Sequence, residues 1–131
     1  MRARLLLRVR TPSSTVLDAP VHAIRAEDAD GWFGFGPGRA ELVAELPAGL
    51  LVYRDDDGEG YVAVDGGLLH VRGEECRVMV RDAVASRQLD AIGAELDRYV
   101  ERRRERIERE RGIIDELARE ALRRLAQEVR R

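Results

Sequence analysis

The residue types that could carry out catalysis are few in this chain and stand apart from one another. The two histidines, His22 and His70, lie in strand-like runs, and neither has a metal-binding type of residue beside it. No Ser-His-Asp or Cys-His arrangement accompanies them. Cys76, the one cysteine, excludes an internal disulfide, and its alternating run predicts a buried structural thiol. The residues alone therefore favour a non-enzymatic binding or coupling protein.

Three segments could bind a ligand, and each lacks part of the pattern that binding requires. The glycines of GFGPG (34–38) would need a following helix and usually a lysine to hold phosphate, and the chain has no lysine. The aspartates at 55–57 lack the spacing of a calcium loop and indicate a solvated turn. The arginines at 102–111 alternate with glutamates, which repel a nucleic-acid backbone. We expect no cofactor, no metal and no nucleic-acid partner.

Composition indicates one domain, or a small domain with an appendage, within 131 residues. Apolar residues make up 44%, enough for a core, and the 37% of charged residues nearly balance to a net charge of −2. No apolar run approaches the ~18 residues of a membrane span. The apolar part of the N-terminus is too short for a signal sequence and reads as the first strand of a cytosolic protein.

The segment 30–40, DGWFGFGPGRA, is too rich in glycine to form a helix and predicts a loop. It also holds three of the chain's few large aromatic residues, Trp32, Phe33 and Phe35. Aromatic side chains in such a loop either pack the loop onto the core or form an interaction surface. The sequence leaves both interpretations open.

Short strand-like runs separated by turn residues surround this segment and predict an antiparallel β-sandwich or barrel. A Pro-Ala-Gly break at 47–49 and a Gly-Gly turn at 66–67 interrupt the runs, and the segment 41–46 is ambiguous between a strand and a helical turn. The expected strands are 4–10, 14–17, 21–26, 50–53, 61–65, 68–72 and 76–81.

The apolar spacing changes to three and four residues after Asp82, which predicts helix to the end of the chain. Residues 101–111 carry only one apolar residue, Ile107, and Gly112 is the one helix breaker. Two helices meeting near Gly112 are favoured over one long helix with a loose middle, because their apolar faces could cover each other. We expect an α+β chain with a sandwich domain at 1–85 and a two-helix hairpin at 86–131.

Charge divides along the same boundary. Residues 1–85 contain ten arginines and fourteen acidic residues, for a net charge of −4, whereas residues 86–131 carry +2. Residues 119–131 alone carry +3. A basic helical tip predicts a partner surface that is acidic where the tip lands.

The order of these features resembles the ε subunit of F-type ATP synthases, with departures that hint at a divergent or alternative F-type ATPase. The resemblance covers nearly the whole chain. It is carried by the VDGGL turn at 64–68, by the segments 47–50 and 78–83, and by the glycine motif residues Gly31, Phe33, Gly34, Pro37, Gly38 and Ala40. It implies a flattened ten-stranded sandwich and a helical hairpin. It also implies a non-catalytic rotor subunit that couples the c ring to the γ subunit and the catalytic head, peripheral at the cytoplasmic face of the bacterial inner membrane.

The resemblance further implies two contact sites. One is an interface with the stalk and c ring, formed by Asp30, Gly31, Trp32, Phe33, Phe35, Pro37, Gly38 and Arg39. The other is a regulatory contact with an acidic segment of the catalytic β subunit, formed by Arg119, Arg123 and Arg124, through which the last helix would inhibit ATP hydrolysis.

This sequence departs from the family pattern in two places, the glycine motif and the start of the helical part. Phe35 and Gly36 stand where an apolar pair is usual, and Arg39 stands where the family has histidine, so we expect a rewired ring contact. Many members bind regulatory ATP through a first-helix pattern. Asp90 and Ala94 match that pattern, but Gly93 replaces its phosphate-binding arginine. We therefore expect no ATP site.

Two other functions stay open at this point. A free-standing sandwich and coiled-coil module would associate with itself through its helices. An arginine-rich nucleic-acid binder would show strong salt-dependent binding, and the net charge argues against it.

Overall fold

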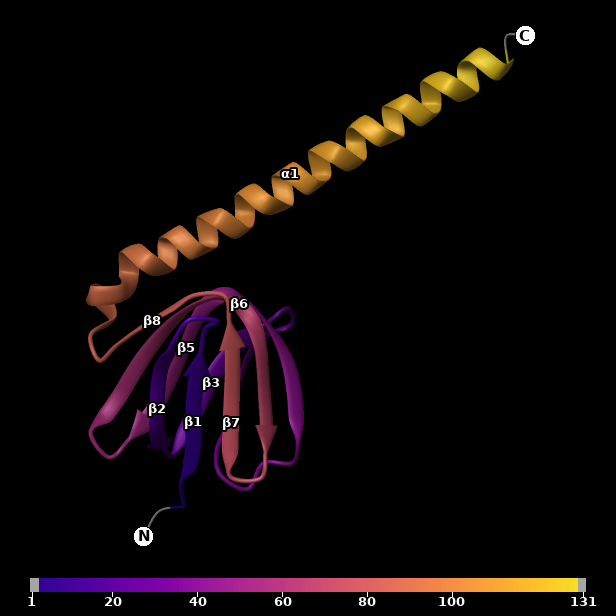
Figure 1. Cartoon of the computed structure of the whole chain (residues 1–131). Helices are drawn as coiled ribbons and strands as arrows, with labels where there is room; N and C mark the ends of the chain where they lie inside the picture. The colour runs from indigo at the N-terminus through magenta and orange to yellow at the C-terminus, as the bar shows by residue number, and fades with distance from the viewer. Residues whose placement is uncertain (1–2, 130–131) are drawn as a thin grey trace. The chain divides into compact units, whose positions relative to one another are not determined.

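The computed structural model describes residues 3–129, which form eight strands and one helix (Figure 1). The chain divides into two compact units, one reaching Val100 and the other beginning at Glu101, and each is described by itself. The elements are β1 (Leu5–Arg10), β2 (Thr15–Val21), β3 (Ala23–Asp28), β4 (Gly31–Phe35), β5 (Leu42–Asp55), β6 (Gly58–Arg72), β7 (Glu75–Val80), β8 (Ala83–Ser86) and α1 (Leu89–Val129).

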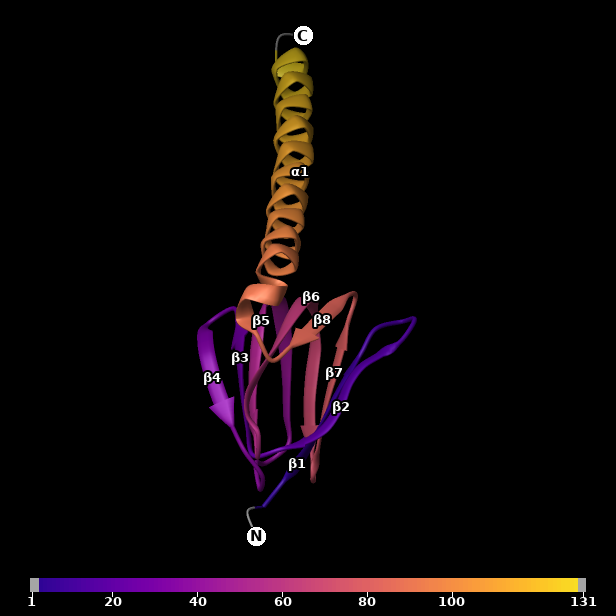
Figure 2. The same ribbon diagram turned by 90° about the vertical axis from the view of Figure 1, so that its left-hand side faces the viewer.

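The strands form one sheet in the order β2-β1-β7-β6-β5-β3-β4, and β8 pairs with the first half of β6. Its pairs are antiparallel except for β1 with β7. The sheet folds over itself into two layers that face each other. Side chains from β1 and β7 share one buried cluster with side chains from β3 and from the C-terminal half of β5. Figures 1 and 2 show the resulting two layers. The predicted sandwich is therefore confirmed, with one parallel pair that the sequence did not indicate.

The fold-over occurs inside β5 and β6, which are 14 and 15 residues long. Pro47 is skipped in the pairing, whose register is the same on both sides, with Leu46 opposite Gly67 and Ala48 opposite Asp65. This is expected of a residue that cannot donate to the ladder. Opposite it, Gly66 has a φ of +78°, and a Cβ on Gly67 would lie 2.0 Å from the Met79 carbonyl oxygen. The predicted breaks at 47–49 and 66–67 are thus wrong: they mark bends within two continuous strands. The ambiguous segment 41–46 is largely strand.

The glycine-rich segment is also more regular than predicted. Residues 31–35 form β4, an edge strand that pairs with β3, so the predicted loop is wrong for this half of the segment. Phe33 and Phe35 lie two residues apart and therefore on one face of the strand. Their rings stack with centroids 6.1 Å apart and pack against the main core. The local signal for a loop was overridden because this packing and the pairing with β3 compensate for the glycines.

The core itself follows the alternation of the strands. Leu5, Leu7 and Val9 of β1 are fully buried, and so is Cys76 of β7. Burial raises the pKa of the Cys76 thiol to about 12, which keeps the sulfur protonated and unreactive. The predicted buried thiol is confirmed.

The predicted two-helix hairpin is wrong: residues 89–129 form one helix, α1. Gly112 costs a helix only about 1 kcal/mol relative to alanine, and the sequence has no proline after Pro47. Ion pairs four residues apart, such as Arg104 with Glu108 at 3.7 Å, support the charged segment. A single glycine is therefore not enough to end the helix. The helix carries too many charges to cross a membrane, and no other helix occurs between residues 3 and 129.

The first three turns of α1 belong to the first unit. Ile92 and Tyr99 are buried against Ala63 of β6, and Leu96 packs beside them. The pKa of Tyr99 is raised because its hydroxyl is removed from water and lies near Asp82. In the second unit Ile107 is partly exposed, and six large apolar side chains further along are more than half exposed, namely Ile113, Ile114, Leu117, Leu122, Leu125 and Val129.

Candidate functional site

Three large apolar side chains are exposed on the outer face of β5, β6 and β7. They are Val43, Leu68 and Met79, which are 64%, 46% and 51% exposed. Leu68 pairs directly with Met79, and Val43 pairs with His70, two residues further along the face from Leu68. The three side chains therefore share one face of the sheet. We call this set the apolar stripe.

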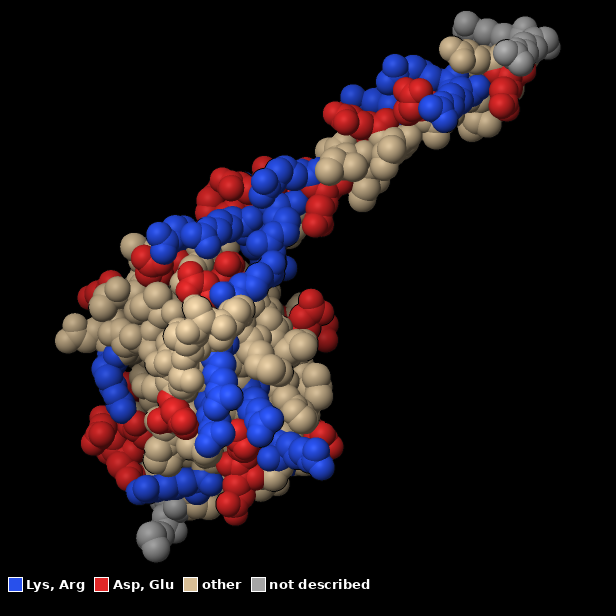
Figure 3. Space-filling model, viewed as in Figure 1, with Lys and Arg blue, Asp and Glu red and all other residues tan. Residues whose placement is uncertain are grey.

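Basic side chains border the apolar stripe. Arg10 pairs with Met79 across β1 and β7, and in the next row Arg77 lies between Arg8 and His70. Figure 3 shows basic side chains gathered over the front strands of the sandwich, beside a broad uncharged area. His70 approaches Glu41 at 2.9 Å, and this contact lowers the pKa of that carboxyl. An apolar surface with an arginine border fits a protein partner that carries acidic groups.

An open hollow of about 760 Å³ adjoins one end of the apolar stripe. Leu68 and Met79 line it together with Pro12, and Arg10 and Arg81 contribute basic groups. Gly66 and Gly67 also line the hollow, and β7 approaches Gly67 too closely for any side chain. The close approach explains the VDGGL motif in physical terms.

The predicted stalk and c-ring residues separate into two groups in the structure. Phe33 and Phe35 are half-buried against the core, whereas Trp32 is 56% exposed at the start of the same strand. Asp30 closes the turn before β4 by donating its amide to Asp28 Oδ1 at 2.8 Å. Packing onto the core therefore holds for the two phenylalanines. Trp32 is exposed, and its part in an interaction surface stays a prediction.

The remaining members of that predicted set lie at or beyond the ends of β4. Gly31 begins the strand, and Pro37, Gly38 and Arg39 follow it in the connection to β5. Gly38 and Arg39 are exposed. A role in contacting a ring stays a prediction for all of them.

The predicted regulatory arginines lie in the second unit and are exposed. Arg123 and Arg124 both reach Glu120 of the same helix, at 3.7 and 3.4 Å, and Arg119 is exposed. Such exposed pairs contribute about 0.2–1 kcal/mol each, so a partner carboxylate could displace Glu120 at little cost. Their contact with another subunit stays a prediction.

The family's ATP pattern falls on the first turns of α1. Asp90 is exposed in the first turn, and the space beside Gly93 is empty, with nothing within 4 Å of the point where a Cβ would lie. Steric crowding therefore does not explain the glycine, and the phosphate-binding guanidinium of the pattern is missing here. The family's pattern is therefore incomplete in this chain, and the expectation of no ATP site stays a prediction. Between residues 3 and 129 no three His, Cys, Asp or Glu side chains gather as a metal site would require.

Sequence reasoning missed a polar cluster at the turn between β5 and β6. Asp56 and Asp57 are exposed as expected of a solvated turn, but the Asp55 side chain is only 13% exposed and makes two hydrogen bonds with Arg87. The Arg87 guanidinium lowers the pKa of the Asp55 carboxyl, and His22 does the same for Asp56. Arg87 lies 32 residues away in the sequence, so no local pattern could have indicated this pair.

Residues 4–86 match the family model described as "ATP synthase, Delta/Epsilon chain, beta-sandwich domain". The chain is 36% identical over 130 residues to ATP synthase epsilon chain 2 of Cereibacter sphaeroides, covering 97% of this chain and 89% of the relative. It is 31% identical over 109 residues to the ATP synthase epsilon chain of Carboxydothermus hydrogenoformans, covering 83% and 80%.

The fold is similar to a chain in the solved structure of the Euglena gracilis mitochondrial ATP synthase with OSCP, F1 and the c-ring. The TM-score is 0.60 at 22% identity, over 73% of this chain and 63% of that one. At this identity the likeness concerns the fold alone.

Proposed function

This chain belongs to the family of ATP synthase epsilon chains, and on that premise we propose that it acts as a non-catalytic rotor subunit. In this role it couples the ring of c subunits to the γ subunit and the catalytic head during ATP synthesis and hydrolysis. A rotor part must transmit torque without deforming. The sandwich suits that demand because one buried cluster joins both of its layers.

The apolar stripe carries the assignment of the γ subunit as partner. Val43, Leu68 and Met79 expose apolar area on a sheet face that would otherwise be polar. Each side chain is about half exposed already, so its full burial against a partner would contribute roughly half of the ~1.5–3 kcal/mol expected for a fully exposed one, before the costs of association. The arginines bordering the stripe would orient the partner rather than supply most of the affinity.

Trp32 supports a second contact, with the c ring. Tryptophan is the residue type most enriched in the energetic centres of interfaces, and this one is exposed on a hairpin that Phe33 and Phe35 hold onto the core. Arg39, in the connection after β4, would give this contact a basic character that the family's histidine lacks.

The second unit supports a contact with the catalytic β subunit. Its large apolar side chains between residues 113 and 129 are exposed, as expected of a helix whose partner lies outside the chain. Arg119, Arg123 and Arg124 would meet an acidic segment there and restrain hydrolysis. Membrane association would come only through the complex, at the cytoplasmic face of the bacterial membrane.

Co-expression with the γ subunit from the same genome tests the proposal. The wild-type chain should co-purify with γ in equal amounts, and Leu68→Glu with Met79→Glu should abolish the complex. Trp32→Ala is the matched control: it removes an equally exposed apolar side chain, and it should keep γ while weakening retention of the c ring. Trp32→Ala should unfold at the wild-type temperature, because its side chain is exposed. The double glutamate variant should unfold a few degrees lower, because the two new carboxylates lie directly opposite each other, and it should still be folded at the temperature of the assay.

Loss of γ binding in the Trp32→Ala variant alone would contradict the assignment of the stripe. A wild-type chain that ignores γ and associates with itself would favour the free-standing interaction module, whose supporting observation is the exposed apolar side chains of residues 113–129.

A further inference from the structure

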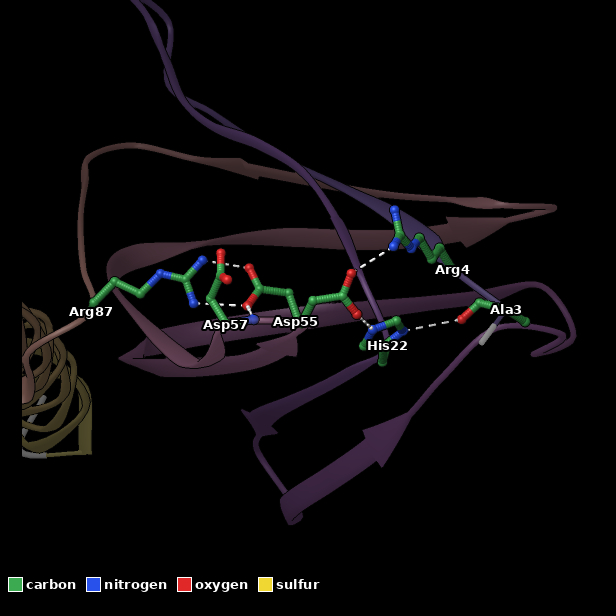
Figure 4. Close-up of polar contacts among 7 residues, drawn as sticks. Ala3, Arg4, His22, Asp55, Asp57 and Arg87 are labelled. Atoms are coloured by element: carbon green, nitrogen blue, oxygen red, sulfur yellow. Dashed lines mark hydrogen bonds and ion pairs between the residues drawn. The ribbon is translucent and has the colours of Figure 1, made fainter. Parts of the chain in front are cut away.

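The connection between β8 and α1 is tied to the turn between β5 and β6. β8 ends at Ser86 and α1 begins at Leu89, so Arg87 stands at the entrance of the helix. Its guanidinium donates two hydrogen bonds to the Asp55 carboxylate, Nη1 to Oδ1 at 2.8 Å and Nη2 to Oδ2 at 2.5 Å (Figure 4). A bidentate pair of this kind is both stronger and more directional than a single contact.

The ring of Tyr53 adds a second contact to Arg87. The guanidinium carbon lies 5.5 Å from the ring centroid, within the range of a cation–π interaction. The ring itself is 4% exposed and presses on Gly60, where an added Cβ would lie 2.1 Å from the ring carbon Cζ. The absence of a side chain at Gly60 thus leaves the space in which Tyr53 lies beneath Arg87.

The turn that receives Arg87 is held independently of it. Asp55 Oδ1 also accepts the Asp57 amide at 3.0 Å, which fixes the carboxylate within the turn. The neighbouring Asp56 contacts His22 Nε2 at 2.5 Å and Arg4 Nη2 at 2.6 Å, and His22 in turn contacts the Ala3 carbonyl at 3.3 Å (Figure 4). The turn therefore stays in place when Arg87 leaves.

The segment that Arg87 holds packs on the sandwich through the small side chains of β8. Ala83 is buried in the main core, and Val84 and Ala85 pack against the two buried clusters. β8 is four residues long and pairs with β6 alone, and the entrance of the helix is closed by Ser86 Oγ accepting the Gln88 amide at 3.0 Å. The first apolar anchor of α1 is Ile92, five residues after Arg87. A short edge strand followed by a lightly anchored turn is the kind of segment that opens locally.

We propose that Arg87 is a latch that holds the start of α1 on the sandwich, with the Asp55 carboxylate and the Tyr53 ring as its fixed receiver. Closing the latch keeps the end of β8 and the first turn of α1, which precede the buried anchor Ile92, docked beside β6. Opening it releases the entrance of the helix while both sandwich layers stay folded. This inference goes beyond the proposed function and needs no partner subunit. In a rotor, such a latch would control how readily the helical segment changes position.

Hydrogen exchange of the isolated full chain tests the latch. Arg87→Ala should make the amides of residues 84–96 exchange about tenfold faster, in keeping with the loss of a charge-assisted bidentate pair and a cation–π contact. Asp55→Asn should give the same regional pattern with a smaller increase, because the contact with Tyr53 remains. The double variant should exchange no faster than Arg87→Ala, because Arg87→Ala already removes the interaction with Asp55. Arg87→Lys keeps the charge without the fork and should lie between Arg87→Ala and the wild type.

Two arginines provide matched controls. Arg98→Ala removes an ion pair with Glu95 inside α1, and Arg77→Ala removes an ion pair with Glu75 on β7, whose atoms lie 2.9 Å apart. Neither variant should make the amides of residues 84–96 exchange faster. Unchanged exchange in Arg87→Ala would overturn the latch. Equally faster amide exchange throughout β1 and β7 would also overturn it, because Arg87 would then stabilise the whole sandwich. The same holds if residues 84–96 exchange as fast in Arg98→Ala as in Arg87→Ala.

Discussion

The sandwich and the helical segment 101–129 use their apolar residues in opposite ways. In the sandwich, alternating residues from distant strands meet in one buried cluster, and few large apolar side chains are left exposed. In the helical segment the apolar side chains recur at helical spacing, and the large ones from Ile113 to Val129 are exposed. The first region is stabilised by contacts between distant parts of the chain, and the second by local hydrogen bonds and ion pairs.

This difference indicates how each region would interact with a partner. The sandwich can fold first and then offer a preformed surface, the apolar stripe, at little conformational cost. The helical segment has an apolar face whose burial must come from outside it, so its position can respond to a partner. Glycine substitutions, core truncations and pH should separate the two regions.

Substitution of the two most informative glycines should give the largest contrast. Gly67→Val should lower the free energy of unfolding by more than about 4 kcal/mol, because the new Cβ would collide with the backbone of β7. Gly112→Ala should instead raise helix content and add up to about 1 kcal/mol of local helix stability, since nothing lies within 4 Å. Urea unfolding followed by Trp32 fluorescence and by circular dichroism would measure both. Equal effects of the two substitutions on the free energy of unfolding would contradict the contrast between a sandwich held by distant contacts and a helix held by local ones.

Truncation of one leucine in each region should give a smaller contrast. Leu7 is fully buried, so Leu7→Ala should lower the free energy of unfolding by about 3 kcal/mol through lost burial and the cavity left behind. Leu117 is 65% exposed, and Leu117→Ala should change it by less than about 0.5 kcal/mol. Thermal unfolding of the isolated chain checks both, and a large loss from Leu117→Ala would show that the helical face is already buried.

Acid should lower the stability of the sandwich through its paired carboxylates. We expect this effect to be smaller than those of the glycine substitutions and the leucine truncations. Arg87 lowers the folded-state pKa of Asp55, His22 that of Asp56 and His70 that of Glu41. A lowered folded pKa adds stability above the ordinary carboxyl pKa of about 4, and that stability is lost as the pH falls through the folded value. The unfolding temperature should therefore fall below about pH 4.

An Asp55→Asn variant is the control for this pH dependence. It removes one of the three carboxylates, so its unfolding temperature should fall less between pH 5 and pH 3, within the window of about 2–5 in which carboxylates titrate. A slope identical to that of the wild type would show that the Asp55–Arg87 pair contributes nothing to acid stability.

The sequence anticipated those features that depend on near neighbours. Alternation predicted the strands and the buried Cys76, and spacings of three and four predicted helix after Asp82. The glycine motif and VDGGL carried the resemblance to the ε subunit family that the comparisons then showed. Residues 83–86 gave no strand signal, because a four-residue strand is too short for its period to be recognised.

Predictions from the sequence were wrong where the same local residues are compatible with two structures. Pro47 and Gly66 look like breaks, yet the strands continue through them because paired strands on both sides supply hydrogen bonds and a core. Gly112 looks like the corner of a hairpin, yet its cost of about 1 kcal/mol is small beside the propensity of the flanking residues. Trp32 and Phe33 are adjacent in the sequence, and only the pairing of β4 with β3 places one outward and the other against the core.

By itself, then, the sequence determined the order of sandwich and helix, the alternating core and the family, because periodicity and backbone preference act between residues close along the chain. The tertiary structure decided what requires distant residues to meet. It bent β5 and β6 into both layers, brought Val43, Leu68 and Met79 onto one exposed face, and placed Arg87 on Asp55. These contacts join residues from 11 to 32 positions apart, and their energies arise from burial and charge pairing that exist only once the sandwich has formed.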